Sequence, residues 1–147
     1  MNITIISVGK LKERYLKDAI AEYSKRLTRY CKLDIIELQD EKTPDNASEK
    51  EEELIKENAF VVAMDLKGKQ LTSEEFANFI ENQGIIGNSN IVFIIGGSLG
   101  ISQDVIKRAN EKICFSKMTF PHQLFRVMLL EQIYRGFRIM KNEPYHK

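Results

Sequence analysis

The chain has two histidines, His122 and His146, and both stand near its C-terminal end. Histidine is the side chain most easily tuned for proton transfer near neutral pH, so these positions are the first candidates for acid–base chemistry. Each also has a purely structural explanation. His122 would then be a helix-start residue bonded to backbone, and His146 would belong to a frayed tail.

A glycine-rich segment, Gly96-Gly97-Ser98-Leu99-Gly100, is the second candidate for chemistry. Glycine lets a backbone pass close to a ligand, and its free amide can meet acceptor atoms. The segment matches neither the dinucleotide fingerprint nor a phosphate-binding P-loop, because its glycine spacing differs and no Lys-Ser/Thr pair follows. By itself it indicates either a ligand contact or a tight strand-to-helix turn.

The elements that position these residues alternate between strand and helix. Apolar residues at three- and four-residue spacing predict helices, and short apolar runs predict strands. Strands are expected at 1–8, 33–38, 60–65, 91–95 and 113–116, and helices at 11–30, 72–84, 103–110 and 121–142. A turn is expected at 67–69, and a capping box at Ser48 and Glu51 predicts a short acidic helix. A second capping box is expected at Thr72 and Glu75, and Ser102 is expected to cap the helix at 103–110.

This order predicts an α/β fold, with one domain over residues 1–147 and a mainly parallel sheet that carries helices on both faces. The run Ile91–Ile95 has no polar alternation, as expected of a strand covered on both faces. In open α/β sheets, ligands bind beyond the carboxyl ends of the strands. The loops after Asp65, Ile95 and Ser116 are therefore the candidate site.

Charge is unevenly distributed although the net charge is +1. Residues 1–32 carry eight Lys/Arg against three Asp/Glu, residues 115–147 carry six against two, and residues 33–60 carry three against ten. A basic face that binds nucleic acid is compatible with this pattern, and so are charges that simply solvate helix faces. The arginines of the last helix also suit a dimer interface.

Several classes of protein are disfavoured. No apolar run approaches the ~20 residues of a membrane span, and the N-terminus lacks the signature of a signal peptide, so a cytoplasmic protein without a membrane partner is expected. Cys31 and Cys114 lack metal-ligand spacing. We expect both to be reduced thiols, and we expect no metal site.

Four segments together resemble the RlmH family of the SPOUT superfamily. They are 1–32 with Val8-Gly-Lys-Leu-Lys12, Ile94-Ile-Gly-Gly-Ser98, Phe115-Ser-Lys-Met-Thr-Phe-Pro-His122 and Glu143-Pro-Tyr-His146. The resemblance implies an S-adenosylmethionine-dependent methyltransferase that acts on N3 of a pseudouridine in a stem-loop of bacterial 23S rRNA, in the assembled ribosome. It also implies a homodimer and a C-terminal trefoil knot over about 91–142.

Site residues follow from the same resemblance. The implied cofactor-binding residues are Met64, Gly96, Phe115, Ser116, Lys117, Met118, Thr119 and Phe120. His146 and Tyr145 are the expected catalytic residues, which contact the target base and ease its deprotonation. Contacts with RNA phosphates or with a second copy are expected from Arg126, Arg135, Arg138 and Lys147.

One departure from the family and two alternative functions accompany this interpretation. The region between Ser48 and Phe60 is about a dozen residues shorter than the resemblance leads one to expect, which bears on the packing beside the third strand. A non-catalytic RNA- or ribosome-binding factor of the same fold would not need the cofactor loop or the terminal Tyr145-His146. A SPOUT enzyme that acts on tRNA would keep the cofactor and change the RNA.

Overall fold

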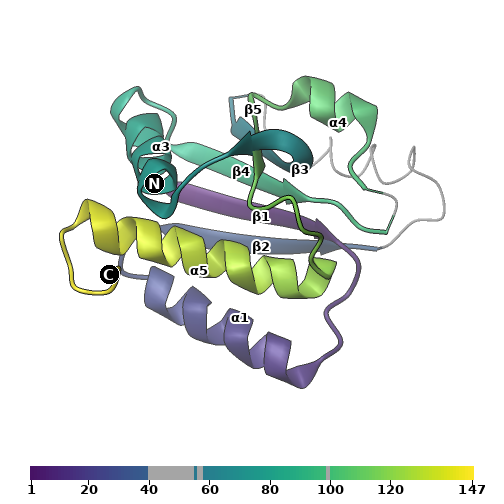
Figure 1. Ribbon diagram of the computed structural model, residues 1–147, viewed down its shortest axis with the longest axis horizontal. Coiled ribbons are helices and arrows are strands. Elements are labelled where there is room, and N and C mark those ends of the chain that lie inside the picture. The colour runs from purple at the N-terminus through teal and green to yellow at the C-terminus, as the bar shows by residue number, and fades with distance from the viewer. Residues whose placement is uncertain (40–54, 56–57, 99) are drawn as a thin grey trace.

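The computed structural model describes residues 1–39, 55, 58–98 and 100–147. Its five strands form one sheet in the order β2-β1-β4-β3-β5, and every neighbouring pair is parallel. The elements are β1 (Asn2–Val8), α1 (Arg14–Leu27), β2 (Lys32–Leu38), β3 (Phe60–Gln70), α3 (Ser73–Ile85), β4 (Asn90–Ile95), α4 (Gln103–Arg108), β5 (Glu111–Cys114) and α5 (His122–Met140) (Figure 1). This α/β architecture confirms the predicted fold class.

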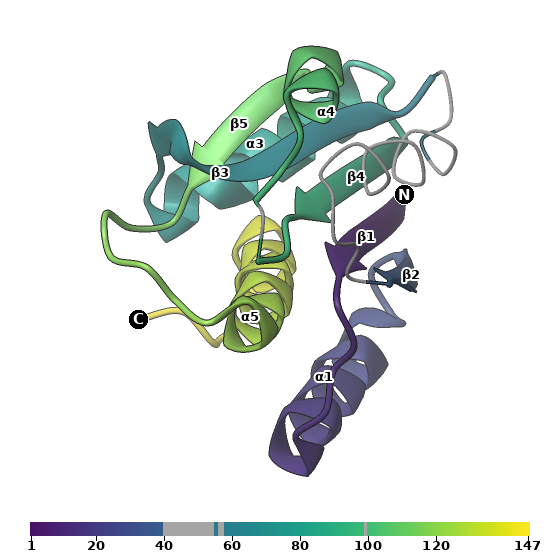
Figure 2. The ribbon, with the colours of Figure 1, turned by 90° about the vertical axis from the view of Figure 1, so that its right-hand side faces the viewer.

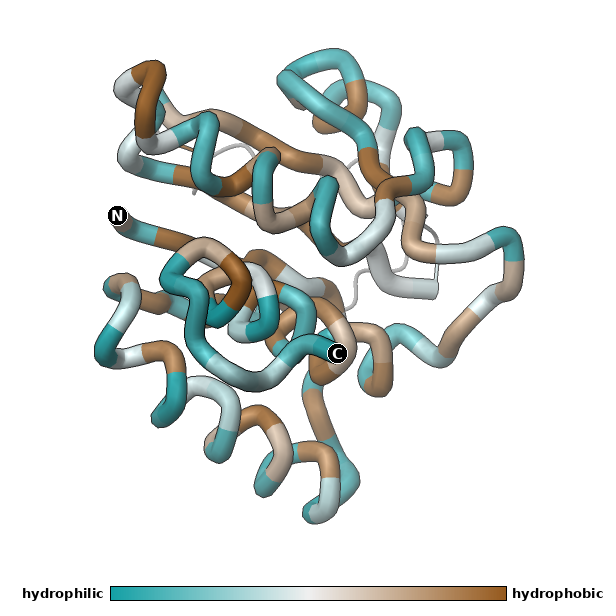
Figure 3. The backbone as a smooth tube through the Cα atoms, turned by 60° about the vertical axis from the view of Figure 1, so that its left-hand side comes forward, coloured by the Kyte–Doolittle hydropathy of each residue, from teal (hydrophilic) through white to brown (hydrophobic). Residues whose placement is uncertain are grey.

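Helices cover both faces of the sheet, as predicted (Figure 2). On one face, α1, α3 and α5 bury Leu27, Phe76 and Leu129 against the strands. On the other face, Val105 of α4 packs on Ile94. Successive residues of a strand point to opposite faces, so both clusters draw on the same strands. In Figure 3 the hydrophobic residues accordingly concentrate along the strands.

β4 occupies the centre of the sheet, between β1 and β3. Its residues Ile91–Ile95 are all buried, which confirms the interpretation of the apolar run as a strand covered on both faces. The loop that follows β4 therefore starts from the buried centre of the sheet. This placement gives the glycine segment a fixed position beside the ends of β3 and β5.

Two helix starts are formed as their sequences predict. The Thr72 hydroxyl accepts from the backbone N–H of Glu75 (3.1 Å), and the Glu75 carboxylate accepts from the backbone N–H of Thr72 (2.9 Å), which completes a capping box at the start of α3. Ser102 caps α4 by accepting from the backbone N–H of Val105. The capping box expected at Ser48 and Glu51 lies outside the described residues.

β3 differs most from its prediction. The strand continues to Gln70, past its expected end at Asp65, and the turn expected at 67–69 does not form. The register against β5 instead shifts between Met64 and Lys69. A Cβ at Gly68 would lie 2.6 Å from the backbone nitrogen of Ile113. The glycine therefore permits a close approach of two strands and does not mark a turn.

Other boundaries move by a few residues. α1 begins at Arg14 and not at Leu11, whose backbone N–H donates to the carboxylate of Glu37 (2.8 Å). α3 runs through Gly84 to Ile85, and β5 covers Glu111–Cys114, so Phe115 already belongs to the following loop. From β5, at one edge of the sheet, the chain returns through α5 to α1 and α3. This path is consistent with the expected knot, which stays a prediction.

Candidate active site

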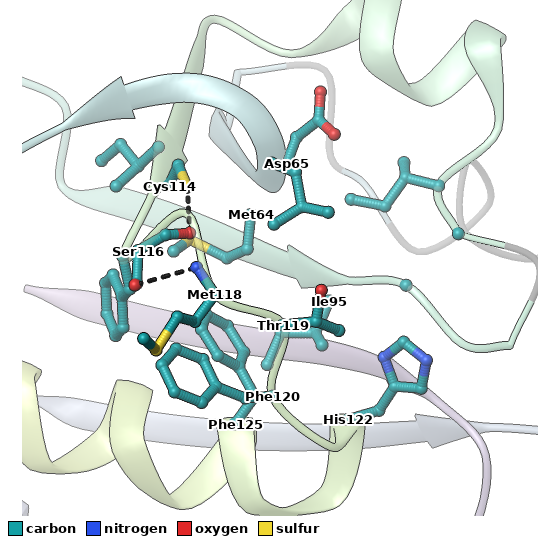
Figure 4. Close-up of a pocket in the computed structure, with 16 residues that line it drawn as sticks. Met64, Asp65, Ile95, Cys114, Ser116, Met118, Thr119, Phe120, His122 and Phe125 are labelled. Atoms are coloured by element: carbon teal, nitrogen blue, oxygen red, sulfur yellow. Dashed lines mark hydrogen bonds between the residues drawn. The ribbon is translucent and has the colours of Figure 1, made fainter.

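A cavity opens where the loops after β3, β4 and β5 meet (Figure 4). Its empty space is about 740 Å³ when its open mouth is included. We call it the first cavity, and its lining is Met64, Asp65, Leu66, Ile95, Gly96, Gly100, Ile101, Ile113, Cys114, Phe115, Ser116, Met118, Thr119, Phe120, His122 and Phe125. It lies at the carboxyl ends of the strands, as the rule for open α/β sheets predicts.

Most side chains expected to bind the cofactor meet in this cavity. Seven of the eight line it, and Lys117 does not. Sequence reasoning had named Asp65 only as the end of a strand, and it assigned no cofactor contact to Cys114 or Phe125. The strand-end rule could have found Asp65. Phe125 follows the helical apolar pattern, which gives no sign that its ring also faces a cavity.

The glycine segment is a tight turn. A Cβ at Gly96 would lie 2.6 Å from the carbonyl carbon of Gly100, so no larger residue fits without moving backbone. Gly97 pairs with Gly100, whose backbone N–H donates to the Gly97 carbonyl (3.0 Å), and Gly100 has φ of 75°. The turn alone is thus sufficient reason for these glycines. A ligand contact at Gly96 stays a prediction.

The loop after β5 is fixed at its start and open at its tip. The Phe115 ring packs on Phe125 with centroids 5.0 Å apart, which holds the loop to α5. The backbone N–H of Met118 donates to the Ser116 hydroxyl (3.1 Å), while the Met118 side chain is 74% exposed. The largely apolar lining suits the face of a flat ring such as a purine.

Two titratable side chains of the first cavity have no partner that the structure describes. The Asp65 carboxylate forms no ion pair or hydrogen bond within residues 1–39, 58–98 and 100–147. The same holds for the ring of His122, which is exposed at the first position of α5. The alternative in which that ring bonds to backbone is therefore not seen among these residues.

The C-terminal tail is tied to α3 and α5, contrary to the picture of a frayed end. Arg135 donates from Nη1 to Nδ1 of His146 (3.0 Å), and Nε2 of His146 lies 2.6 Å from a carboxylate oxygen of Glu74. Tyr145 donates to Glu131 (2.7 Å), which also pairs with Arg135 (2.7 Å). We call these five residues the tail cluster.

Electrostatics in the tail cluster follow from these contacts. Burial raises the pKa of Glu131, but hydrogen bonds from Arg135 and Tyr145 outweigh it and leave that pKa below its ordinary value. Burial, together with the neighbouring Glu131 carboxylate, raises the pKa of Tyr145, so its phenol stays protonated at neutral pH. The hydrogen bond with His146 lowers the pKa of Glu74.

The tail cluster and the first cavity are separate within one chain, since neither Tyr145 nor His146 lines that cavity. A second cavity, of about 850 Å³ with its mouth, lies between them. It shares Ile113, Phe115 and Phe120 with the first cavity, and Glu131 of the tail cluster lines it. Within one chain, this second cavity thus separates the predicted catalytic pair from the first cavity.

Arg126 is an internal residue, which corrects the expectation that it contacts phosphates or a second copy. It is 3% exposed and pairs with Glu37 (2.6 Å). Its second terminal nitrogen donates to the carbonyls of Gly9 (2.6 Å) and Val8 (3.2 Å). These partners occupy both terminal nitrogens, so the side chain joins α5 to β1 and β2.

The remaining predicted cations differ in their freedom. Arg138 donates to Glu143 (2.8 Å) and to the carbonyl of Pro144 (2.8 Å), which fixes the chain as it leaves α5. Arg135 belongs to the tail cluster, and Lys147 is exposed. Contacts of these three residues with RNA or with a second copy stay predictions.

Two further observations concern metals and membranes. In the part of the chain that the structure describes, His, Cys, Asp and Glu side chains form no group of three or more that could hold a metal ion. Among the described helices, none combines the length and the apolar character required to cross a membrane. Cys31 and Cys114 are both free thiols, as expected.

Comparisons with known proteins complete the description. The chain is 75% identical to "Ribosomal RNA large subunit methyltransferase H" of Clostridium beijerinckii, and 73% identical to "Ribosomal RNA large subunit methyltransferase H 1" of Clostridium perfringens, with 100% of both chains covered in each case. These alignments span 159 positions against 147 residues here, a difference of 12. The size of the predicted shortening agrees with this difference, and its position stays a prediction.

A solved structure supports the fold. "The structure of a probable methylase family protein from Haemophilus influenzae Rd KW20" aligns with a TM-score of 0.56 at 9% identity, over 99% of this chain and 70% of that chain. At such low identity the likeness concerns the fold alone. The family described as "Predicted SPOUT methyltransferase" matches residues 1–146. The chain therefore belongs to the SPOUT methyltransferase family.

Proposed function

We propose that the protein transfers a methyl group from S-adenosylmethionine to N3 of a pseudouridine in a stem-loop of bacterial 23S rRNA, in the assembled ribosome. The observation that carries this proposal is the convergence of seven predicted cofactor residues on the first cavity. Full-length relatives at 75% and 73% identity are named as methyltransferases of large-subunit ribosomal RNA, which supports the choice of RNA.

The lining of the first cavity supports S-adenosylmethionine as the cofactor. Met64, Phe115 and Phe120 offer apolar surface to a purine ring, and the backbone of residues 115–120 offers hydrogen bonds to its edge and to a ribose. The carboxylate of Asp65, which has no partner among the described residues, suits a positively charged ligand. When bound, the cofactor supplies a methyl group on a sulfonium, which is an excellent leaving group. The protein must then orient the target nitrogen and handle its proton.

Tyr145 and His146 contact the target base in this proposal. In one chain the tail cluster holds them away from the first cavity. They reach a base there either when the tail leaves α3 and α5 or when a second copy presents its tail to the cavity. The second route needs the homodimer that the resemblance implies, so the dimer and the catalytic role of the tail belong together.

Recognition of the RNA requires more than the cavity. Lys17 and Lys25 of α1, and Arg29 in the turn that follows it, are exposed and suit contacts with phosphates. A base in a stem-loop can be splayed out for chemistry without opening a duplex. Because this small chain would form one binding surface per dimer, we expect the assembled ribosome, and not a short RNA motif, to provide specificity.

Transfer of labelled methyl from S-adenosylmethionine to ribosomes that lack the modification tests the proposal. We expect wild-type protein to label 23S rRNA on ribosomes and much less so as naked RNA, with N3-methylpseudouridine found by mass spectrometry. Labelling of tRNA instead would indicate another SPOUT activity. Ribosome binding without labelling, and without a shift of the melting temperature by the cofactor, would indicate a binding factor. Equal labelling of naked rRNA would refute the role of the ribosome.

A further inference from the structure

We infer that His122 is a further catalytic residue, whose ring accepts the proton that N3 of the target base loses during methyl transfer. This inference rests on the proposed function and adds to the contacts of the tail. It identifies a proton acceptor in the first cavity itself, supplied by the same chain that would hold the cofactor.

The position of His122 favours this role. It is the first residue of α5, directly after Pro121, and it lines the first cavity together with Thr119 and Phe120. Figure 4 shows its imidazole at the edge of the cavity beside Thr119, with no dashed line to either nitrogen. The side chain also lines the adjoining hollow between the starts of α1 and α5, so it is reached from solvent. An RNA base that enters the cavity from outside would meet it.

The two histidines differ in whether a ring nitrogen has a lone pair available to accept a proton. Arginine can only donate, so the Nδ1 of His146 beside Arg135 uses its lone pair as an acceptor. Nε2 then carries the proton and donates to Glu74. Neither nitrogen of His146 can take a further proton without losing a contact. The ring of His122 bonds to none of the residues that the structure describes, and a neutral imidazole there keeps one lone pair available.

The proton step is balanced. N3–H of the pseudouridine gives its proton to the unprotonated nitrogen of His122, and the electron pair left on N3 forms the new bond to the methyl carbon. The bond between that carbon and sulfur breaks, and its electron pair stays on sulfur. His122 leaves the step as a cation and releases the proton to solvent through the open mouth of the cavity.

Other charged or titratable groups near His122 bear on a pH profile. Those that line the same two cavities are Asp65, Cys114, Glu13, Tyr15 and Arg126. Arg126 is paired with Glu37, and Glu13 is the residue before α1. Substitution of His122 leaves all these groups in place. A limb of the pH profile that is lost in the variant therefore belongs to the His122 imidazole and not to them.

The test compares the variant H122A with Q123A, its neighbour at the start of α5. The amide of Gln123 donates to the carbonyl of Lys10 and does not line the first cavity, so Q123A is expected to keep its activity. We expect H122A to slow methyl transfer by about 10²–10⁴-fold. Added imidazole should restore part of the rate, and the acidic limb of the pH profile should be lost in H122A.

Two measurements do not depend on turnover. Calorimetry should find cofactor binding by H122A unchanged, because a proton acceptor is not needed to hold the cofactor. Of the two histidine ring signals in the NMR spectrum, the one that is absent from H122A belongs to His122. This signal should shift when S-adenosylmethionine is added to wild type.

Three results would overturn the inference. They are activity of H122A within about twofold of wild type, loss of activity without imidazole rescue, and a ring signal that the cofactor does not move. Failure of wild type to methylate 23S rRNA would remove the proposed function and this inference together. Methylation by wild type and H122A alike would remove the inference alone.

Discussion

Replacing Arg126 by alanine should destabilise the protein, because this side chain joins three elements from a buried position. The variant removes an ion pair with Glu37 and hydrogen bonds to the carbonyls of Val8 and Gly9. Glu37 is 40% exposed, so water can solvate its freed carboxylate, and the cost lies at the lower end of the ~3–5 kcal/mol of a fully buried pair. With two carbonyls left to find water, we expect a loss of about 3 kcal/mol.

Urea unfolding followed by circular dichroism would measure this loss. For a chain of this size, a loss of about 3 kcal/mol corresponds to a fall of roughly 6–12 °C in melting temperature. Arg29→Ala is the matched control, since Arg29 is 65% exposed and its 3.5 Å pair with Glu143 is a surface contact expected to contribute less than about 1 kcal/mol. A variant of Arg126 that is as stable as this control, but binds ribosomes more weakly, would refute the structural role and restore the expected phosphate contact.

Three other perturbations have defined outcomes. The pKa of Glu131 in the folded chain is below its ordinary value. Its carboxylate therefore contributes fully to stability at a pH above the ordinary value, and this contribution is lost as the pH falls through the lower folded pKa. In an acid titration, Glu131→Gln should therefore lack part of the acid-induced loss of stability seen in wild type. Gly96→Ala forces a Cβ to within 2.6 Å of Gly100 and should weaken cofactor binding at least tenfold by calorimetry, whereas unchanged binding would show that the loop relaxes freely. Burial raises the pKa of Cys31 to about 11, so a thiol reagent at pH 8 should modify it only on the timescale of unfolding, and rapid modification in native buffer would contradict the described burial.

Local patterns were sufficient for much of the fold. Helical and strand periodicities predicted every described element, and the capping box at Thr72 and Glu75 was predicted from residues three positions apart. The all-apolar run at 91–95 predicted a strand covered on both faces, and the strand-end rule predicted the loops that line the first cavity. The specific site residues came from resemblance to a family and not from periodicity. Signals of this kind lie within a few residues of the feature they predict, so the sequence alone contains them.

Contacts between distant residues were beyond the sequence. Arg126 was expected on the surface, because a helical pattern shows only which face of the helix is polar. The pattern cannot show that Glu37, 89 positions away, and two backbone carbonyls bind this side chain inside the fold. Gly68 was interpreted as a turn residue. The reason for a glycine there is the close approach of Ile113, which belongs to another strand and is distant in the sequence. By residue type alone the two histidines were equivalent candidates, and the resemblance favoured His146. The fold occupies both nitrogens of His146, whereas those of His122 bond to none of the described residues. Proton-transfer chemistry depends on such occupancy, and only the tertiary structure decides it, because the partners come from elements far apart in the chain.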